Sequence, residues 1–458
     1  MTFFSHRSAV IAAKLLLLTL SAGLLFLSTS CAITLRDADE TVPIRETETE
    51  PSIAKEYDFK PPETEEAVTE KVTVERVLPV EAIEWVERYE VTYGAGAADV
   101  VFLDGNGIRD LNARMLDAAP TLHDMNALPD TMSGSEVRGM IERYALPNDE
   151  RYTEGGALIT SDMRDEVAKN RNLDAIPDTV TLRRAVITGR SDLKGFPTDK
   201  SFHKHGDRHY DGIQETELIS GSPAAVLHSS SDGDFSFVLS YYYSGWIPSK
   251  NVAYCSAEEY ELFVSREDHV TVTSKAVECG GIRFDMGATL PYVSDAAGGY
   301  VVRLPKRSDD TGMLFLEDAV MSARDAVHGT LPFTMRNYYA QAFAYLGTTY
   351  GWGGSDGGVD CSGFVCAIFR TFGIYLPRNT SEQSKYAGDI LSLENDPSGV
   401  LDGIAQPAAV YRPGHVMLYL GKKDGEHYII HAPQGGEQVC VAKLDMARLT
   451  SVSVFGVG

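Results

Sequence analysis

The 458-residue sequence predicts an α+β protein of several domains, and three observations support this prediction. A chain of this length is too long for one hydrophobic core and should divide into domains. Apolar residues recur at helical spacing through 76–180, and short alternating runs separated by turn residues follow through 181–322. The last part, 323–458, combines an apolar helical pattern with two runs that can pair as a hairpin. We therefore expect a mainly helical segment, small β-barrels and a mixed C-terminal domain, in that order.

Composition narrows the classes of partner. The chain is 43% hydrophobic and 23% charged, as is usual for globular proteins, and its formal net charge is −24. A negative charge of this size argues against nucleic acid or an anionic membrane surface as an electrostatic partner. We expect a monomer that binds no nucleic acid and needs no cofactor.

Residues 1–31 have the pattern of a targeting segment. Basic residues precede an apolar run at 15–27, and Ser28, Thr29 and Ser30 lead to Cys31. The run is too short to span a bilayer but fits the apolar region of a signal peptide. Small residues before a cysteine resemble the processing site of bacterial lipoproteins, although Ser28 stands where leucine is usual. We expect a lipid on Cys31 to be the sole membrane attachment; ordinary signal-peptidase cleavage nearby is the alternative.

Residues 32–75 predict an acidic, disordered tether. Between Arg36 and Glu70 there are twelve acidic and four basic residues, with four prolines and few large apolar groups. Such a stretch cannot bury enough surface to offset the entropy lost on ordering. It should space the folded body from the membrane without forming a site of its own.

Residues 76–180 are mostly helical in pattern. The clearest helices are IRDLNARMLDAA at 108–119, SGSEVRGMIERYA at 133–145 and SDMRDEVAKNR at 161–171. Either Ser133 or Ser135 can cap the second of these, because carboxylates enter its first turns. No catalytic grouping is evident in this segment.

Two small β-barrels are predicted next, at 181–256 and 257–322. The strands of the first are AAVLHSS, FSFVLSYYY and WIPSKNVA, with turns at SDGD and at Ser244 and Gly245. Those of the second are HVTVTS, MGATLPYV and GYVVRLPKR. The short runs and regular turns are typical of antiparallel barrels.

The candidate chemistry lies in the last part, 323–458. A glycine-dense turn leads through Asp360 to Cys361 at the first turn of an apolar helix. Backbone N–H groups and the helix dipole at that position favour the thiolate, which is the nucleophilic form. HVMLYLG at 415–421 and HYIIHAP at 427–433 can pair as a hairpin, which would place His431 opposite Met417. His431 would then lie diagonal to His415 on one face, within side-chain reach.

The simplest interpretation of each cysteine is that it is a small apolar residue of the core. Cys366 and Cys440 fit that interpretation, whereas Cys361 sits among glycines and upstream of two histidines. Cys255 and Cys279 could form a disulfide in an oxidising envelope, although the sequence does not fix the pairing.

At this point the residues resemble the NlpC/P60 cysteine peptidases over about 323–458. The motifs that carry the resemblance, in the order of that family, are YGWGG, DCSGF, LPRNTSEQ, PGHVMLYLG and IIHAP. The resemblance implies a papain-like α+β catalytic domain that hydrolyses cell-wall peptides between γ-D-glutamyl and a diamino acid. A thioester acyl-enzyme would be the intermediate.

The resemblance also implies roles for individual residues. Cys361 would be the nucleophile, His415 the base and His431 the orienting residue, with His427 a rival because the hairpin turn is longer than usual. Tyr350 would help the Cys361 N–H to hold the oxyanion, while Asp360, Ser362, Thr380 and Trp352 would contact substrate.

The barrels enter the same resemblance, because GWIPSKNVA is similar to the closing strand of a bacterial SH3 module. Paired SH3-like modules at 181–256 and 257–322, braced by the helical segment, would precede the catalytic domain. The first module would close the substrate site and favour peptides with a free N-terminal L-alanine, whose ammonium Asp360 could accept. Together, the resemblances imply a periplasmic or outer-membrane lipoprotein of the cell envelope that acts on stem peptides or muropeptides. A non-catalytic wall-binding lipoprotein and a related cysteine acyl transferase are the alternatives.

The loop FHKHGDRHYDG carries His203, His205 and His209, a spacing that can indicate zinc. Nearby Cys or paired acidic residues that would complete four ligands are missing, so we expect no metal. We expect this long loop to lean over the catalytic cleft instead.

Overall fold

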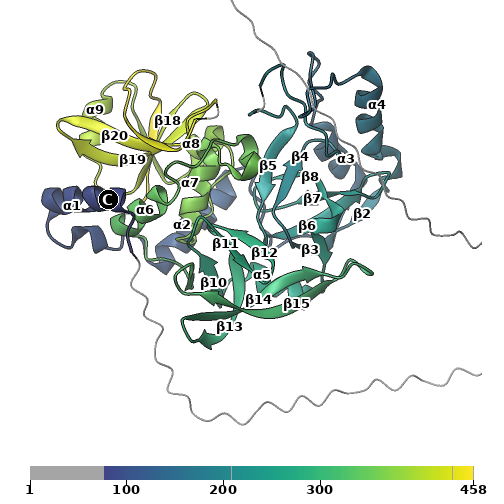
Figure 1. Ribbon diagram of the computed structural model, residues 1–458, viewed down its shortest axis with the longest axis horizontal. Coiled ribbons are helices and arrows are strands. Elements are labelled where there is room, and N and C mark those ends of the chain that lie inside the picture. The colour runs from purple at the N-terminus through teal and green to yellow at the C-terminus, as the bar shows by residue number, and fades with distance from the viewer. Residues whose placement is uncertain (1–76, 208, 436, 457–458) are drawn as a thin grey trace, which may run out of the picture. The chain divides into compact units, whose positions relative to one another are not determined.

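The computed structural model describes residues 77–207, 209–435 and 437–456 (Figure 1). The predicted signal segment 1–31, its Cys31 and the tether 32–75 lie outside the described residues. Within the described part, no helix is both long and apolar enough to cross a membrane.

The first described segment contains four α-helices. They are α1 (Val80–Tyr93), α2 (Gly105–Ala118), α3 (Gly134–Glu142) and α4 (Ser161–Asn170). Two short strands, β1 (Thr131–Ser133) and β2 (Thr179–Thr181), pair antiparallel beside α3. Ser133 caps α3 by accepting from the Glu136 N–H while the Glu136 side chain bonds the Ser133 N–H. Of the two candidate caps, Ser133 is therefore the one used.

The four helices do not form a separate hydrophobic core. Their apolar side chains pack into the cores of later parts of the chain. Trp85 and Leu111 belong to the same buried cluster as Phe369 of the C-terminal part. Val137 and Ile141 instead pack with Trp246 of the first sheet. The segment therefore ties the following parts together, since its helices lose their apolar cover if either part is removed.

The first sheet has seven strands in the order β5-β4-β8-β7-β6-β3-β9. They are β3 (Arg183–Ile187), β4 (Ser191–Lys194), β5 (Gln214–Leu218), β6 (Pro223–Ser229), β7 (Phe235–Leu239), β8 (Ser244–Pro248) and β9 (Val252–Tyr254). The predicted turn at Ser244 and Gly245 is wrong, because Leu239 pairs with Ser244 and the turn is 240–243. Gly245 is a strand residue where a Cβ would lie 2.2 Å from Leu193 Cδ2. The glycine serves close packing there.

The second sheet follows helix α5 (Ala257–Val264) and has the order β15-β14-β13-β10-β16. Its strands are β10 (His269–Val272), β13 (Thr289–Ala296), β14 (Gly299–Arg307), β15 (Leu314–Ser322) and β16 (Ala326–His328). A separate hairpin joins β11 (Ala276–Cys279) to β12 (Ile282–Asp285). Because β16 pairs with β10, this sheet runs a few residues past the expected end at 322.

The C-terminal part is built on a six-stranded sheet with the order β17-β22-β18-β19-β20-β21. Its strands are β17 (Asp389–Ser392), β18 (Ala408–Arg412), β19 (His415–Lys423), β20 (Glu426–His431), β21 (Cys440–Lys443) and β22 (Ser451–Val454). The helices are α6 (Met335–Phe343), α7 (Cys361–Arg370), α8 (Thr380–Tyr386) and α9 (Pro397–Asp402). Helix α7 packs on the sheet face that carries Val416 and Leu418 (Figure 1), and Leu401 of α9 covers the opposite face at Met417.

The described cysteines are all free, so Cys255 and Cys279 do not form the disulfide that the sequence left open. The Cys279 thiol donates to the Val320 carbonyl at 3.6 Å, while Cys255 packs beside Tyr260 of α5. Each cysteine thus fills its own apolar site without a crosslink.

Candidate active site

Cys361 opens α7, with its sulfur buried under neighbouring segments. Asp360 caps the helix by accepting from the Gly363 N–H at 2.7 Å, which fixes Cys361 in the first turn. The Thr380 hydroxyl lies 3.7 Å from the Cys361 sulfur, and the Val416 N–H also hydrogen-bonds to it. Val416 directly follows His415, so strand β19 presents its first residues to the cysteine.

The sulfur is less acidic than its place in the helix predicts. Burial raises the pKa of the Cys361 thiol, and the neighbouring Asp360 carboxylate raises it further. The bonds from Val416 and Thr380 lower it, without outweighing burial at a side chain that is 5% exposed. The expectation that the helix N-terminus favours the thiolate is therefore wrong for the resting site, where the thiol is neutral.

The two histidines form a bonded pair. His415 Nε2 lies 2.8 Å from His431 Nδ1, and their rings meet edge to face. Burial, the His431 ring and Arg412 lower the pKa of His415 to about 3, while burial and Arg412 lower that of His431 to about 4. His415 Nδ1 is buried and has no hydrogen-bond partner among the described residues. A neutral imidazole with one free nitrogen can accept a proton.

The rival histidine lies elsewhere. Leu418 pairs with Ile430, which is the expected register and brings His431 opposite Met417. Toward the turn a bulge between Tyr419 and Gly421 shifts the pairing, so that Lys423 pairs with Glu426 and the turn is shorter than expected. His427 Nδ1 instead lies 2.7 Å from the Tyr419 hydroxyl, and its Nε2 lies 3.4 Å from Ser398. His427 thus serves the packing of α9 and has no contact with the pair.

A cleft of about 600 Å³ adjoins the cysteine. It is lined by the predicted residues Tyr350, Trp352, Asp360, Cys361, Ser362 and Thr380. The histidines are not among its lining residues, but Gly414, the neighbour of His415, is. Further polar side chains line it, among them Glu215, Arg378, Lys385, Arg412 and Gln434.

The Asp360 carboxylate is fully engaged by its surroundings. Arg378 Nη1 and Nη2 donate to its two oxygens at 3.0 and 2.6 Å, and the Gly353 N–H donates at 2.9 Å. Burial opposes its ionisation, but Arg378 and the backbone donors hold the pKa of Asp360 below its usual value. Arg378 Nε also donates to Thr216 of β5 at 2.6 Å. The helix cap and the first sheet are therefore linked through one buried arginine.

Comparison with known proteins identifies two domains in this chain. The NlpC/P60 family profile matches residues 347–454, which hold the cysteine and both histidines. This chain contains an NlpC/P60 domain. A profile for the SH3 domain of the SH3b1 type matches residues 199–248, so an SH3 domain precedes it.

Two curated proteins are similar to parts of this chain. A γ-D-glutamyl-L-lysine dipeptidyl-peptidase of Bacillus cereus is 26% identical over 216 residues, which are 44% of this chain and 60% of that protein. A Bacillus subtilis protein of the same name is 36% identical over 22% of this chain and 32% of its own. The chain thus spans less than two thirds of the length of these relatives.

A solved structure shares the fold. The NlpC/P60 endopeptidase from Photobacterium damselae subsp. piscicida matches 84% of this chain and 98% of its own, with a TM-score of 0.66. The two are 19% identical, so this likeness concerns the fold alone.

The glycine-dense turn of the NlpC/P60 domain is where the SH3 domain docks. Trp352 Nε1 donates to the Gln214 carbonyl of β5 at 2.9 Å. Gly353 and Gly354 both have positive φ, and Cβ atoms there would lie 2.8 Å from Gln214 Cγ and 1.8 Å from Glu217 Oε2. Only glycine provides both the conformation and the room for β5 to come this close.

Docking brings Glu215 into the cleft. Its Oε2 accepts from the Tyr243 hydroxyl at 2.8 Å, and burial raises the pKa of its carboxyl group despite that bond. Motif reasoning missed Glu215 because it lies outside the NlpC/P60 region. A signal was present, since QETEL places Glu215 and Glu217 two apart in a strand and hence on one face.

The histidine-bearing loop reaches the cleft through Tyr210, whose ring centroid lies 4.5 Å from that of Trp352. His203 Nδ1 bonds the Tyr210 carbonyl at 3.0 Å, whereas His205 packs against the Tyr152 ring. In the described part of the chain, no three His, Cys, Asp or Glu side chains converge as they would around a metal ion. The loop supports an aromatic rim of the cleft.

Proposed function

We propose that this protein is a cysteine peptidase that hydrolyses peptidoglycan stem peptides or muropeptides at the γ-D-glutamyl–diamino acid bond. The observation that carries the proposal is the buried Cys361 at a cleft of about 600 Å³, with its sulfur bonded by the N–H of Val416, which directly follows His415 of the bonded histidine pair. The names of the two Bacillus relatives support the choice of bond.

The reaction begins with a neutral thiol and a neutral imidazole. If His415 Nε2–H donates to His431 Nδ1, then His415 Nδ1 is the free acceptor. The Cys361 sulfur attacks the amide carbon as its proton passes to His415 Nδ1, and His415 then protonates the leaving amine. Water, deprotonated by His415, attacks the thioester, and the thiol recovers its proton as the acid product leaves. The Val416 and Thr380 donors stabilise the sulfur as it becomes anionic.

Two donors suit the oxyanion. The Cys361 N–H lies in the first turn of α7, where helical N–H groups have no intrahelical acceptor. The Tyr350 hydroxyl is buried and makes no hydrogen bond of normal geometry to a described residue. Burial, Asp360 and Cys361 raise the pKa of Tyr350, which keeps its hydroxyl protonated as a donor. Preorganised donors of this kind supply a large part of the rate in acyl transfer.

The SH3 domain supplies the group that selects the substrate's amine. A free N-terminal ammonium entering the cleft needs a carboxylate to offset its desolvation. Asp360 was the expected partner, but Arg378 and backbone donors already occupy both of its oxygens. Among the described residues, Tyr243 is the one hydrogen-bond donor to the Glu215 carboxylate, which faces the cleft. We assign Glu215 to the ammonium of an N-terminal L-alanine, with Ser362 and Thr380 nearer the scissile bond.

We propose the following domain arrangement and location for the rest of the chain. Residues 257–322 form a second SH3-like module beside the first at 181–256, and the catalytic domain with a papain-like core is 323–458. The helical segment 76–180 braces them. The protein acts as a monomer in the cell envelope, held by a lipid on Cys31 as a periplasmic or outer-membrane lipoprotein.

A single incubation tests the reaction. The protein is mixed with L-Ala-γ-D-Glu-diaminopimelate and an added amine, and the products are followed by mass spectrometry. Hydrolysis gives L-Ala-D-Glu and the free diamino acid, while an acyl transferase would join L-Ala-D-Glu to the amine. An intact peptide after prolonged incubation with wild-type protein would favour a non-catalytic wall-binding role. Cys361→Ala is the matched blank.

A further inference from the structure

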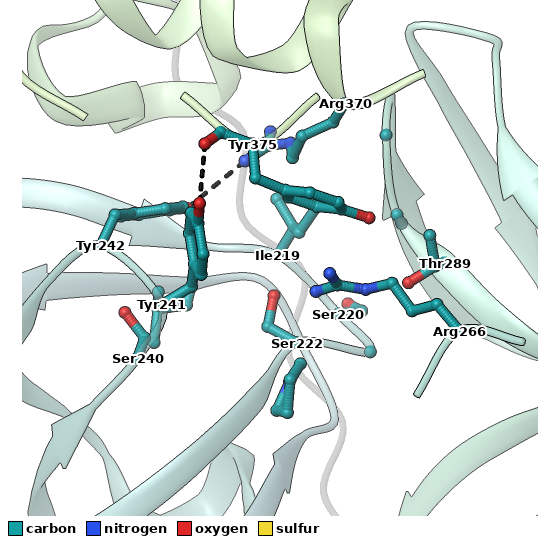
Figure 2. A pocket seen from close by; sticks show the side chains of 15 residues that line it. Ile219, Ser220, Ser222, Ser240, Tyr241, Tyr242, Arg266, Thr289, Arg370 and Tyr375 are labelled. Atoms are coloured by element: carbon teal, nitrogen blue, oxygen red, sulfur yellow. Dashed lines mark hydrogen bonds between the residues drawn. The ribbon is translucent and has the colours of Figure 1, made fainter. Parts of the chain in front are cut away.

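A second cavity lies away from the catalytic cleft, where three parts of the chain meet (Figure 2). It measures about 50 Å³, enough for a group as large as three or four water molecules when one needs about 10–15 Å³. Its walls are the SH3-domain segments 218–223 and 240–242, residues 287–289 with Arg266, and Arg370 and Tyr375 of the NlpC/P60 domain.

Arg370 ends α7 and reaches this cavity from the catalytic side. The side chain is 9% exposed, its Nη1 donates a long 3.4 Å bond to the Tyr242 hydroxyl, and its Nε is buried with no partner among the described residues. No ion pair within 4.0 Å joins it to a described carboxylate, although Glu217, which lines a smaller cavity together with Arg370, contributes to raising its pKa. A buried guanidinium with an open donor is costly unless something accepts from it.

Arg266 enters the cavity from the opposite wall, and Figure 2 shows its guanidinium beneath the ring of Tyr375. The guanidinium carbon lies 4.0 Å from that ring centroid, and Nε is buried without a described partner. Its backbone is in the left-handed region, at φ 50°, which non-glycine residues rarely adopt. The neighbouring packing thus holds this arginine against the cavity.

The charged side chains that line this cavity are all basic. None of the described lining residues is acidic, and the hydroxyls of Ser222 and Thr289 add donors beside the two guanidiniums. The hydroxyls of Ser220 and Ser240 already donate to the carbonyls of Arg283 and Tyr243. A basic pocket of this kind stands out in a chain of net charge −24. The planar donor fork of arginine matches the oxygens of phosphate and carboxylate groups.

We propose that this cavity binds a small oxyanion, with Arg266 and Arg370 as its charged ligands. The anion would accept from guanidiniums on two different parts of the chain and from the Ser222 hydroxyl on a third. Its binding therefore stabilises the junction of the SH3 domain, the second sheet and the NlpC/P60 domain. The inference does not depend on the proposed peptidase activity.

The test uses the whole chain and inorganic phosphate as the probe. Binding is measured by calorimetry and by the shift in Tm, at ionic strength held constant with sodium chloride. We expect saturable binding with a rise in Tm, and Arg266→Gln should raise the Kd at least about tenfold. Arg303→Gln is the matched control because it removes the same charge from β14, outside the cavity, and should bind like wild type. A parallel titration with acetate distinguishes a tetrahedral from a planar oxyanion.

Equal phosphate affinity in wild type, Arg266→Gln and Arg303→Gln would overturn the proposal, because binding would then be nonspecific. A crystal grown with phosphate gives an independent result. Density bridging Arg266 and Arg370 supports the site, whereas phosphate bound elsewhere and absent from this cavity contradicts it.

Discussion

The two walls of the catalytic cleft are built in different ways. The NlpC/P60 wall draws Cys361, His415 and His431 from one helix and one hairpin, inside a single matched region. The SH3 wall contributes Glu215, which accepts from Tyr243 and reaches the cleft only because a glycine turn lets β5 dock. The proposed catalytic groups are thus local in the sequence, whereas the proposed selection of the substrate depends on how two domains pack.

The walls also differ in how their charges are satisfied. On the NlpC/P60 side, Arg378 donates hydrogen bonds to both oxygens of Asp360. The Asp360 carboxylate therefore has a structural role. On the SH3 side, Glu215 has a raised pKa and one side-chain donor. A carboxylate with spare acceptor capacity at a cleft suits ligand capture better than one that is saturated.

The largest effect on activity is expected from a substitution of Cys361 in the NlpC/P60 wall. Cys361→Ala should abolish peptide hydrolysis, since it removes the nucleophile and little volume, and Tm should stay close to wild type. The rate of release of the diamino acid measures this. Cys255→Ala is the control, because that free cysteine lies beside Tyr260 and away from the cleft. Hydrolysis near the wild-type rate in Cys361→Ala would rule out the cysteine mechanism.

His415→Ala should lower kcat by about 10²- to 10⁴-fold, because proton transfer from the neutral thiol needs a positioned base. Combining it with Cys361→Ala should add little, as nucleophile and base act as a unit. Single-turnover kinetics provide the measurement. A loss of less than about tenfold would assign the base to another group.

His431→Asn should be milder, at about tenfold in kcat, because an amide can still hydrogen-bond the His415 ring. His427→Ala is the comparison, since His427 bonds Tyr419 and has no contact with the pair. It should leave kcat unchanged. A larger loss of kcat in His427→Ala than in His431→Asn would contradict the assigned orienting residue.

The histidine pair also predicts a pH dependence of stability. Both folded-state pKa values lie below the ordinary 6.5, at about 3 for His415 and about 4 for His431. The unfolded chain therefore binds protons that the folded one does not, and this contribution is complete above pH 6.5 and lost as pH falls toward 4. Urea unfolding at pH 7 and pH 4.5 should show a greater loss of stability in wild type than in His431→Asn. Equal losses in the two proteins would show that the pair is not held neutral.

The contrast between the walls explains what the sequence could predict. The helix at Cys361, the hairpin register and the approach of loop 201–212 follow from local pattern, and the structure has each of them. The neutral thiol could not be predicted, since burial under Val416 and Thr380 is a tertiary property. Nor could Glu215, because its role needs the contact of β5 with Gly353 and Gly354.

The roles of Cys361, His415 and Glu215 in catalysis and selection remain predictions. Of these, the division of labour between the walls is the central claim, and Glu215 tests it most directly. The measurement is kcat/KM for L-Ala-γ-D-Glu-diaminopimelate with a free or an acetylated N-terminus, in wild type and in Glu215→Gln. Wild type should prefer the free amine by at least about tenfold, equivalent to about 1.4 kcal/mol. In Glu215→Gln that preference should fall severalfold while cleavage of the acetylated peptide persists. Equal rates on both peptides in wild type, or an unchanged preference in Glu215→Gln, would contradict the account.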